Sequence, residues 1–101
     1  MPRTAPPNQT DVLLALLREA RQSAGVTQTA LAEFLGFRQT DISKVERGDR
    51  RLDILELRAW VDGLGVPFLD FVEELHRRLA AQEVLHTQAS GAKAVRNRPK
   101  A

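Results

Sequence analysis

The sequence predicts an all-α protein of five helices, the last of which is extended. Apolar residues recur at helical spacing in five segments of the chain. A glycine follows each of the first four segments, at Gly25, Gly36, Gly48 and Gly65. Glycine readily adopts the positive φ that ends many helices, so these residues mark four breaks. A chain of 101 residues has room for one such domain.

The composition excludes several classes of protein. The chain contains no cysteine, which rules out disulfides and thiolate metal sites and suits a reducing cytoplasm. No apolar run approaches the ~18 residues that span a bilayer, and the N-terminus lacks the apolar core of a signal peptide. We therefore expect a cytoplasmic protein with no membrane contact. The formal net charge of +2 argues against indiscriminate polyanion binding, so any nucleic-acid contact must come from a local patch.

The chain divides into four parts. Residues 1–9 contain three prolines and almost no apolar residue, which predicts a flexible N-terminal arm. Arg3 in this arm could contact DNA, although an idle, solvated terminus is the favoured interpretation. Residues 10–75 carry the helical domain, and residues 76–87 extend its last helix. Residues 88–101 predict a disordered basic tail without acids, whose basic residues are Lys93, Arg96, Arg98 and Lys100.

The first helix is expected to run from Thr10 or Asp11 to Ala24, with Thr10 as its N-cap. The residues expected to face the core are Leu13, Leu14, Leu17, Ala20 and Ala24. Leu16 lies off this stripe, and we expect it to pack either on the C-terminal helix or on another protomer.

The second helix is expected at residues 28–35, capped by Thr27. Its apolar residues are Leu31, Ala32, Phe34 and Leu35. Gly36 permits a sharp reversal after it, and Phe37 is expected to hold that turn against the core.

The third helix, at about residues 38–47, has two different faces. At about 100° per residue, Ile42 and Val45 fall on one side. The other side carries Thr40, Ser43, Lys44 and Arg47, with Gln39 at its leading edge. Spacing alone favours an ordinary solvated face over a binding face.

Asp53 begins the fourth helix, and Glu56 at its third position predicts a capping box. The expected buried stripe comprises Ile54, Leu57, Trp60, Val61 and Leu64. Pro67 suits the first turn of the fifth helix, whose helical propensity persists to about His86. Its apolar side comprises Phe68, Leu69, Phe71, Val72, Leu75 and Leu79.

The segment from Thr27 to Gly48, TQTALAEFLGFRQTDISKVERG, resembles the helix-turn-helix of the lambda repressor/Cro type, the XRE family. The matching residues are Thr27, Gln28, Leu31, Ala32, Leu35, Gly36, Gln39, Ile42, Ser43, Val45, Glu46 and Gly48. The resemblance extends over about residues 10–75. It implies a lambda-repressor-like five-helix DNA-binding domain, with a helix-turn-helix at about residues 27–47 whose second helix enters the major groove.

The resemblance also implies roles for individual residues. Positions matching Gln39, Thr40 and Lys44 contact bases, whereas Gln28 holds a phosphate at its helix N-terminus. The side chains suit these roles, because a Gln amide pairs with adenine and a lysine with guanine, and Ser43 can donate or accept. The residues expected at the DNA backbone are Arg38, Arg47, Arg50 and Arg51. Arg21 and Glu46 match a structural ion pair of the family, although two independent surface charges are the alternative.

Two residues depart from the family pattern. Arg38 stands where a Ser or Thr cap is common, and arginine cannot accept an amide proton. Either Thr40 caps a helix that starts later, or Arg38 compensates by contacting DNA. Asp41 near the groove would repel phosphate, although a carboxylate that accepts from a cytosine amine would be selective. Its angle places it on the flank of the helix, where solvation or pairing with Lys44 or Arg38 is the favoured interpretation.

Other chemistry finds little support in the sequence. His76 and His86 are ten residues apart, about 280° around a helix, and cannot share a metal there. The chain has no nucleotide-binding glycine motif and no nucleophile–base pattern. We therefore expect no enzyme activity, no metal and no cofactor.

The sequence thus predicts a transcriptional regulator, a repressor that binds an inverted repeat in double-stranded DNA as a homodimer. The C-terminal extension, through Leu79, Val84 and Leu85, is expected to hold the dimer. The alternative is an antitoxin whose tail binds a toxin protein while its helix-turn-helix autoregulates the operon. An adaptor that has lost DNA binding is a third possibility, disfavoured by the intact polar row on the third helix.

Overall fold

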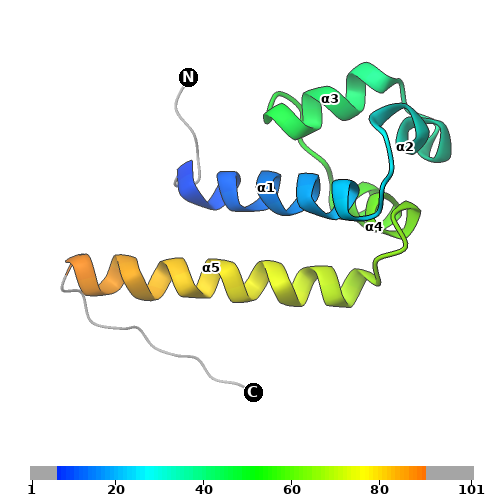
Figure 1. Ribbon diagram of the computed structural model, residues 1–101. Helices are drawn as coiled ribbons and strands as arrows, with labels where there is room; N and C mark the ends of the chain where they lie inside the picture. Colours follow the sequence, from blue (N-terminus) through cyan, green and yellow to red (C-terminus); the bar gives the residue numbers. More distant parts are fainter. Residues whose placement is uncertain (1–6, 91–101) are drawn as a thin grey trace.

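The computed structural model describes residues 7–90, and the side chains of residues 9–83. Within this range it contains helices only, which confirms the all-α prediction. The helices are α1 (Pro7–Ser23), α2 (Gln28–Leu35), α3 (Gln39–Arg47), α4 (Ile54–Gly63) and α5 (Phe68–Ser90). In Figure 1, α1 and α5 run antiparallel and side by side, and α2, α3 and α4 gather near one end of this pair.

All five helices contribute to a single core. Its buried residues are Leu16, Leu17, Leu31, Ala32, Ile42, Val45, Trp60, Val61, Leu64 and Phe71. Trp60 is fully buried, which confirms that it is a core residue. Its indole N–H finds no acceptor among the described residues, so Trp60 stabilises the fold through apolar packing.

Local hydrogen bonds fix the ends of the middle helices as predicted. The Thr27 hydroxyl accepts from the N–H of Ala30 at 3.0 Å, at the start of α2. Gly36 ends α2 with φ of 74°, a conformation that turns the chain toward α3. Asp53 and Glu56 form the predicted capping box of α4, each carboxylate accepting from the other residue's N–H at 2.7 and 3.0 Å.

The outer helices are longer than the sequence patterns indicated. α1 begins at Pro7 rather than at Thr10, so Thr10 is not its N-cap, and residues 7–9 of the predicted arm are helical. Proline suits a first helical turn, because its φ is fixed and no N–H is needed there. α5 continues to Ser90 and takes up residues 88–90 of the predicted tail. The rest of the arm and the tail lie outside the described residues.

Four residues predicted to supply apolar core surface are exposed instead: Ala24, Phe34, Ile54 and Leu69. Ile54 and Leu69 lie in the first turns of α4 and α5, where the neighbouring helices do not cover them. Phe34 nevertheless packs on Gly63, since a Cβ built at Gly63 would lie 2.5 Å from the Cδ2 atom of the Phe34 ring. Leu16 is buried, so it serves the core of its own chain and is closed to another protomer.

The C-terminal extension contacts α1 of its own chain. Leu75, the last residue before the extension, packs against the core. Arg78 donates to Glu19 of α1 at 2.9 Å and to Glu74 at 2.7 Å. These contacts lower the pKa of both carboxyl groups and raise the pKa of Arg78. Arg78 of the extension therefore has a partner in its own chain, Glu19 of α1. The side chains of Val84 and Leu85 lie outside the described residues.

An ion pair between Arg21 and Glu46 ties α1 to α3. Glu46 is only 3% exposed, and the Arg21 side chain only 13%. The guanidinium donates two hydrogen bonds to the carboxylate, at 2.6 and 3.0 Å. A third Arg21 hydrogen bond reaches the Val26 carbonyl at 2.9 Å, and Arg18 donates to the Glu46 carbonyl at 2.9 Å. The pair thus fixes one end of α3 against α1 and the loop that precedes α2.

Two opposing effects act on the pKa of Glu46. Burial alone raises it, but hydrogen bonds from Arg21 and Gln28 and the charges of Arg21 and Arg18 outweigh that effect. The pKa of the folded protein is therefore below the ordinary carboxyl value.

We expect Glu46→Gln to lower the free energy of unfolding by about 1–3 kcal/mol near neutral pH, because Arg21 keeps its charge without a counter-charge. The stabilisation by Glu46 is complete above its unfolded-state pKa of 4.5 and is lost as the pH falls through the lower folded-state value. Urea titrations of both proteins should therefore converge in acid. Glu33→Gln on the exposed side of α2 is the matched control. A double-mutant cycle with Arg21→Met must give a coupling energy, and additive effects would contradict the pairing.

Candidate nucleic-acid interface

α3 presents its polar side at the surface and its apolar side to the core. Ile42 and Val45 are buried, whereas Gln39, Thr40 and Lys44 are exposed. α3 packs against α1 and α2, and in Figure 1 it lies across α1 from α5. The angular arithmetic of the sequence therefore predicted the two faces of α3 correctly.

The Asp41 carboxylate accepts a backbone hydrogen bond at the start of α3, where no Ser or Thr cap is present. The helix begins at Gln39, so the alternative in which Thr40 caps a later helix is wrong. The Arg38 N–H donates to the Asp41 carboxylate at 3.0 Å, and the Arg38 guanidinium lies 3.7 Å from the same carboxylate. This hydrogen bond and the nearby positive charges, including those of Arg50 and Lys44, lower the pKa of Asp41. The carboxylate is thus engaged by its own helix end and the Arg38 side chain remains exposed.

A chain of hydrogen bonds leads from the buried ion pair to the exposed start of α3. The Gln28 amide nitrogen donates to Glu46 at 3.1 Å, and the Gln39 amide nitrogen donates to the Gln28 oxygen at 2.6 Å. The direction of both bonds follows from chemistry, because an ionised carboxylate only accepts and so must face the Gln28 nitrogen. The Gln28 oxygen then faces Gln39, which must offer its own nitrogen in turn.

This chain determines what Gln39 presents to the solvent. Its carbonyl oxygen is left free to accept, and its second amide hydrogen is left free to donate. Adenine offers a donor at N6 and an acceptor at N7 on its major-groove edge, which is the complementary pattern. Gln28 likewise keeps one amide hydrogen, which is sufficient for a single contact with a phosphate oxygen. The sequence resemblance drew attention to Gln28 and Gln39 but gave no sign that the two side chains meet.

Arg50 is partly committed to the fold. It donates to Glu56 of α4 at 3.1 Å, and its guanidinium lies 4.9 Å from the centroid of the Phe37 ring. The second contact is a cation–π interaction between the loop after α3 and the turn before it. Spacing in the sequence did not predict it, because the two residues are brought together only when the turn closes.

The other cationic candidates differ in how firmly they are held. The Arg47 guanidinium donates to the Ser43 hydroxyl and, at 3.2 Å, to the Asp49 carboxylate. Arg47 is therefore held by two neighbouring side chains. Arg51 and Lys44 are exposed and have no carboxylate within 4.0 Å among the described residues. These two side chains are free to reach a polyanion without breaking an ion pair.

Within residues 7–90, no group of three His, Asp or Glu side chains is arranged to hold a metal ion. No helix there is long and apolar enough to cross a membrane.

Comparison with known proteins agrees with this geometry. Residues 17–71 match the helix-turn-helix family. An XRE-family like protein from Pseudomonas syringae pv. tomato is 38% identical with a TM-score of 0.67, over 70% of this chain and 87% of that one. None of the curated proteins matches the sequence significantly.

Two regulators of known structure are also similar. The clp gene regulator ClgR from Corynebacterium glutamicum is 28% identical with a TM-score of 0.65, over 81% of this chain and 87% of that one. The restriction-modification controller protein C.Esp1396I is 29% identical with a TM-score of 0.65, over 71% of this chain and 95% of that one. With the family match spanning more than half of its length, the chain belongs to the XRE family of helix-turn-helix DNA-binding regulators.

Proposed function

We propose that this regulator is a repressor that binds an inverted repeat in double-stranded DNA as a homodimer, with α3 in the major groove. The observation that carries the proposal is the preorganised Gln39 amide on the polar face of α3. A side chain held in advance loses less conformational entropy on binding than a free one. Occupation of promoter DNA is sufficient for repression.

The base contacts fall to the exposed residues of α3, and the phosphate contacts to the residues around it. Gln39 suits adenine, Lys44 suits guanine, and Thr40 and Ser43 supplement them. The proposed backbone contacts are Gln28, Arg38, Arg47, Arg50 and Arg51. Among these arginines, Arg51 is the one that needs to break no ion pair within the described residues to contact a phosphate.

The relatives support a regulatory function. Two of them are a clp gene regulator and a restriction-modification controller protein. The antitoxin alternative depends on residues 88–101, most of which lie outside the described residues. Recovery of a stable small-protein partner on the tagged chain would favour that alternative.

DNA affinity should depend steeply on salt. If each protomer neutralises about three phosphates, log K should fall against log salt with a slope near −5 for the dimer. Fluorescence anisotropy with a duplex selected from a random pool measures the slope. Salt-independent affinity, or failure to select any sequence, would overturn the proposal.

Base contacts and backbone contacts should respond differently to substitution. Gln39→Ala and Lys44→Ala should each cost about 1–3 kcal/mol and relax the preference at particular base pairs. Arg51→Ala should weaken binding to all sequences alike and make the salt slope shallower by about one per protomer. Selection from random DNA with each variant checks the assignment, which fails if Gln39→Ala leaves the selected sequence unchanged.

Gln28→Ala tests whether preorganisation matters. The change frees Gln39 from its acceptor, so we expect a loss of base preference at the position that Gln39 contacts, in addition to any loss of overall affinity. Thr29→Ala, at the next and exposed residue of α2, is the matched control. An unchanged preference in Gln28→Ala would mean that Gln39 is oriented by the DNA alone.

A further inference from the structure

A surface hollow lies between α1, the loop that follows α3, and α4. Its volume is about 430 Å³, which is within the range of sites that hold small molecules. Leu17 and Val45 are each only 1% exposed and form the floor of the hollow. The complete aliphatic lining comprises Leu13, Leu14, Leu17, Val45, Leu52 and Leu57.

The rim of this hollow is basic. Arg47, Arg50 and Arg51 line it together with a single acid, Asp49. Asp49 is paired with Arg47, and Arg50 is paired with Glu56 of α4. Arg51 is exposed and makes no ion pair among the described residues. The hollow thus combines an aliphatic floor with an excess of positive charge at its mouth, and one guanidinium there is free to bind an anion.

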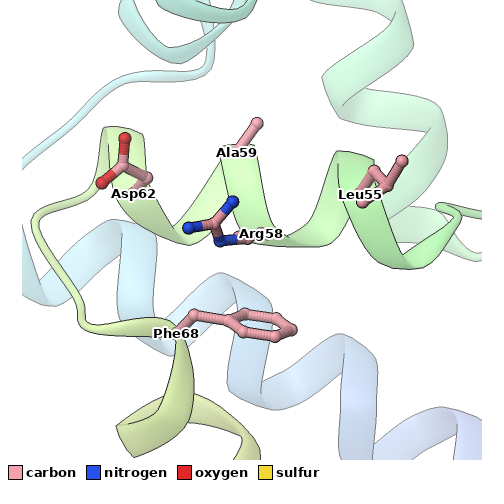
Figure 2. A pocket seen from close by; sticks show the side chains of 5 residues that line it. All are labelled: Leu55, Arg58, Ala59, Asp62 and Phe68. Carbon is pink, nitrogen blue, oxygen red and sulfur yellow. The ribbon is translucent and has the colours of Figure 1, made fainter.

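A second hollow, on another side of α4, lacks these properties. It also measures about 430 Å³ and is lined by Leu55, Arg58, Ala59, Asp62 and Phe68. Figure 2 shows Arg58 and Asp62 on α4, with the Phe68 ring below that helix. The charges of Arg58 and Asp62 cancel, and only Leu55 and Phe68 offer large apolar surfaces. This second hollow has no excess charge, so it serves as an internal control.

We propose that the hollow with Arg51 at its rim binds an amphipathic anion, an aliphatic carboxylate of about eight carbons. The alkyl chain covers the leucines of the lining, and the carboxylate at the mouth accepts from the Arg51 guanidinium. A guanidinium is well suited to this contact, because it presents paired N–H groups to the two carboxylate oxygens. Residues 1–6 precede α1, whose Thr10 also lines the hollow, but they contain Arg3 and no acid. Their charge therefore does not complement the basic rim.

The bound carboxylate opposes DNA binding. Arg51 is a proposed phosphate contact, so a carboxylate on its guanidinium competes with a DNA phosphate for the same donors. This consequence rests on the proposed function, whereas the binding of the carboxylate itself does not. The DNA-binding domain would then respond directly to a small molecule.

Isothermal titration of the full chain with octanoate, in the absence of DNA, tests the site. We expect a dissociation constant of about 1 mM or lower. From hexanoate to decanoate, binding should tighten by up to about fourfold for each CH₂ that is buried. Acetate lacks the chain and octylammonium carries the opposite charge, so neither should bind. In methyl NMR spectra, octanoate should shift the signals of Leu13 and Leu52 and leave that of Leu55, in the second hollow, unchanged.

Substitution of Arg51 tests the charged contact. Arg51→Ala should weaken octanoate binding by roughly fivefold or more, and Arg51→Glu should abolish it. Because Arg51 is exposed, both variants should keep the thermal unfolding midpoint of the wild type. Arg58→Ala removes the arginine of the second hollow and should leave octanoate binding unchanged.

Several results would overturn the inference: no octanoate binding, equal binding of octylammonium, affinity that is independent of chain length, or unchanged affinity in Arg51→Glu. Signals of the lining that respond to removal of residues 1–6 but not to octanoate would also overturn it, and would assign the hollow to the chain's own N-terminal segment.

Fluorescence anisotropy with the selected duplex separates this inference from the proposed function. Octanoate at about ten times its dissociation constant should weaken DNA binding by roughly threefold or more. Acetate at the same concentration controls for ionic strength, and an equal effect of both anions would contradict the competition. A chain that binds octanoate but no duplex would reject the proposed function and leave the carboxylate site standing.

Discussion

The buried ion pair between Arg21 and Glu46 is the interaction on which the rest of the interface depends. A charge as deeply buried as Glu46 is tolerable only if its oxygens are fully engaged. Arg21 and Gln28 provide that engagement from two different helices. The same contacts that satisfy the carboxylate therefore set the positions of α1, α2 and α3 relative to one another. The core packs around this arrangement but does not orient any polar group in it.

Positive charge is distributed sparingly around α3. Most of its basic side chains are balanced locally, by Asp41, Asp49 or Glu56, so the free protein carries no large unscreened patch there. Such balancing keeps a small domain soluble and limits nonspecific attraction to polyanions. In the proposed complex with DNA, these weak, exposed ion pairs are exchanged for phosphate contacts, which costs little because such pairs contribute little to stability.

The periodicity of apolar residues predicted which side of each helix faces the core. It did not predict which residues on that side are covered by neighbouring helices. The middle helices were placed within a residue of their observed starts, because Thr27, Gly36 and Asp53 act through bonds within a few residues. Ile54 and Leu69 were misplaced because their exposure is decided by neighbouring helices. The contacts of Arg50 with Phe37 and of Gln28 with Gln39 join residues on different elements. Only the folded turn brings these residues together.

Gln39 donates to Gln28, and Gln28 donates to Glu46. This order of donors and acceptors fixes the orientation of both amide groups. A glutamine amide is nearly symmetric in shape, and a free one can rotate to exchange donor for acceptor at little cost. Here an ionised carboxylate at the buried end forbids that rotation in Gln28, and Gln28 forbids it in Gln39. Because the pKa of Glu46 is lowered, its carboxylate stays ionised and keeps both amide groups in one orientation. As long as that carboxylate stays ionised, the Gln39 amide keeps one fixed order of donor and acceptor at the surface, which in the proposed complex is the order that a base meets.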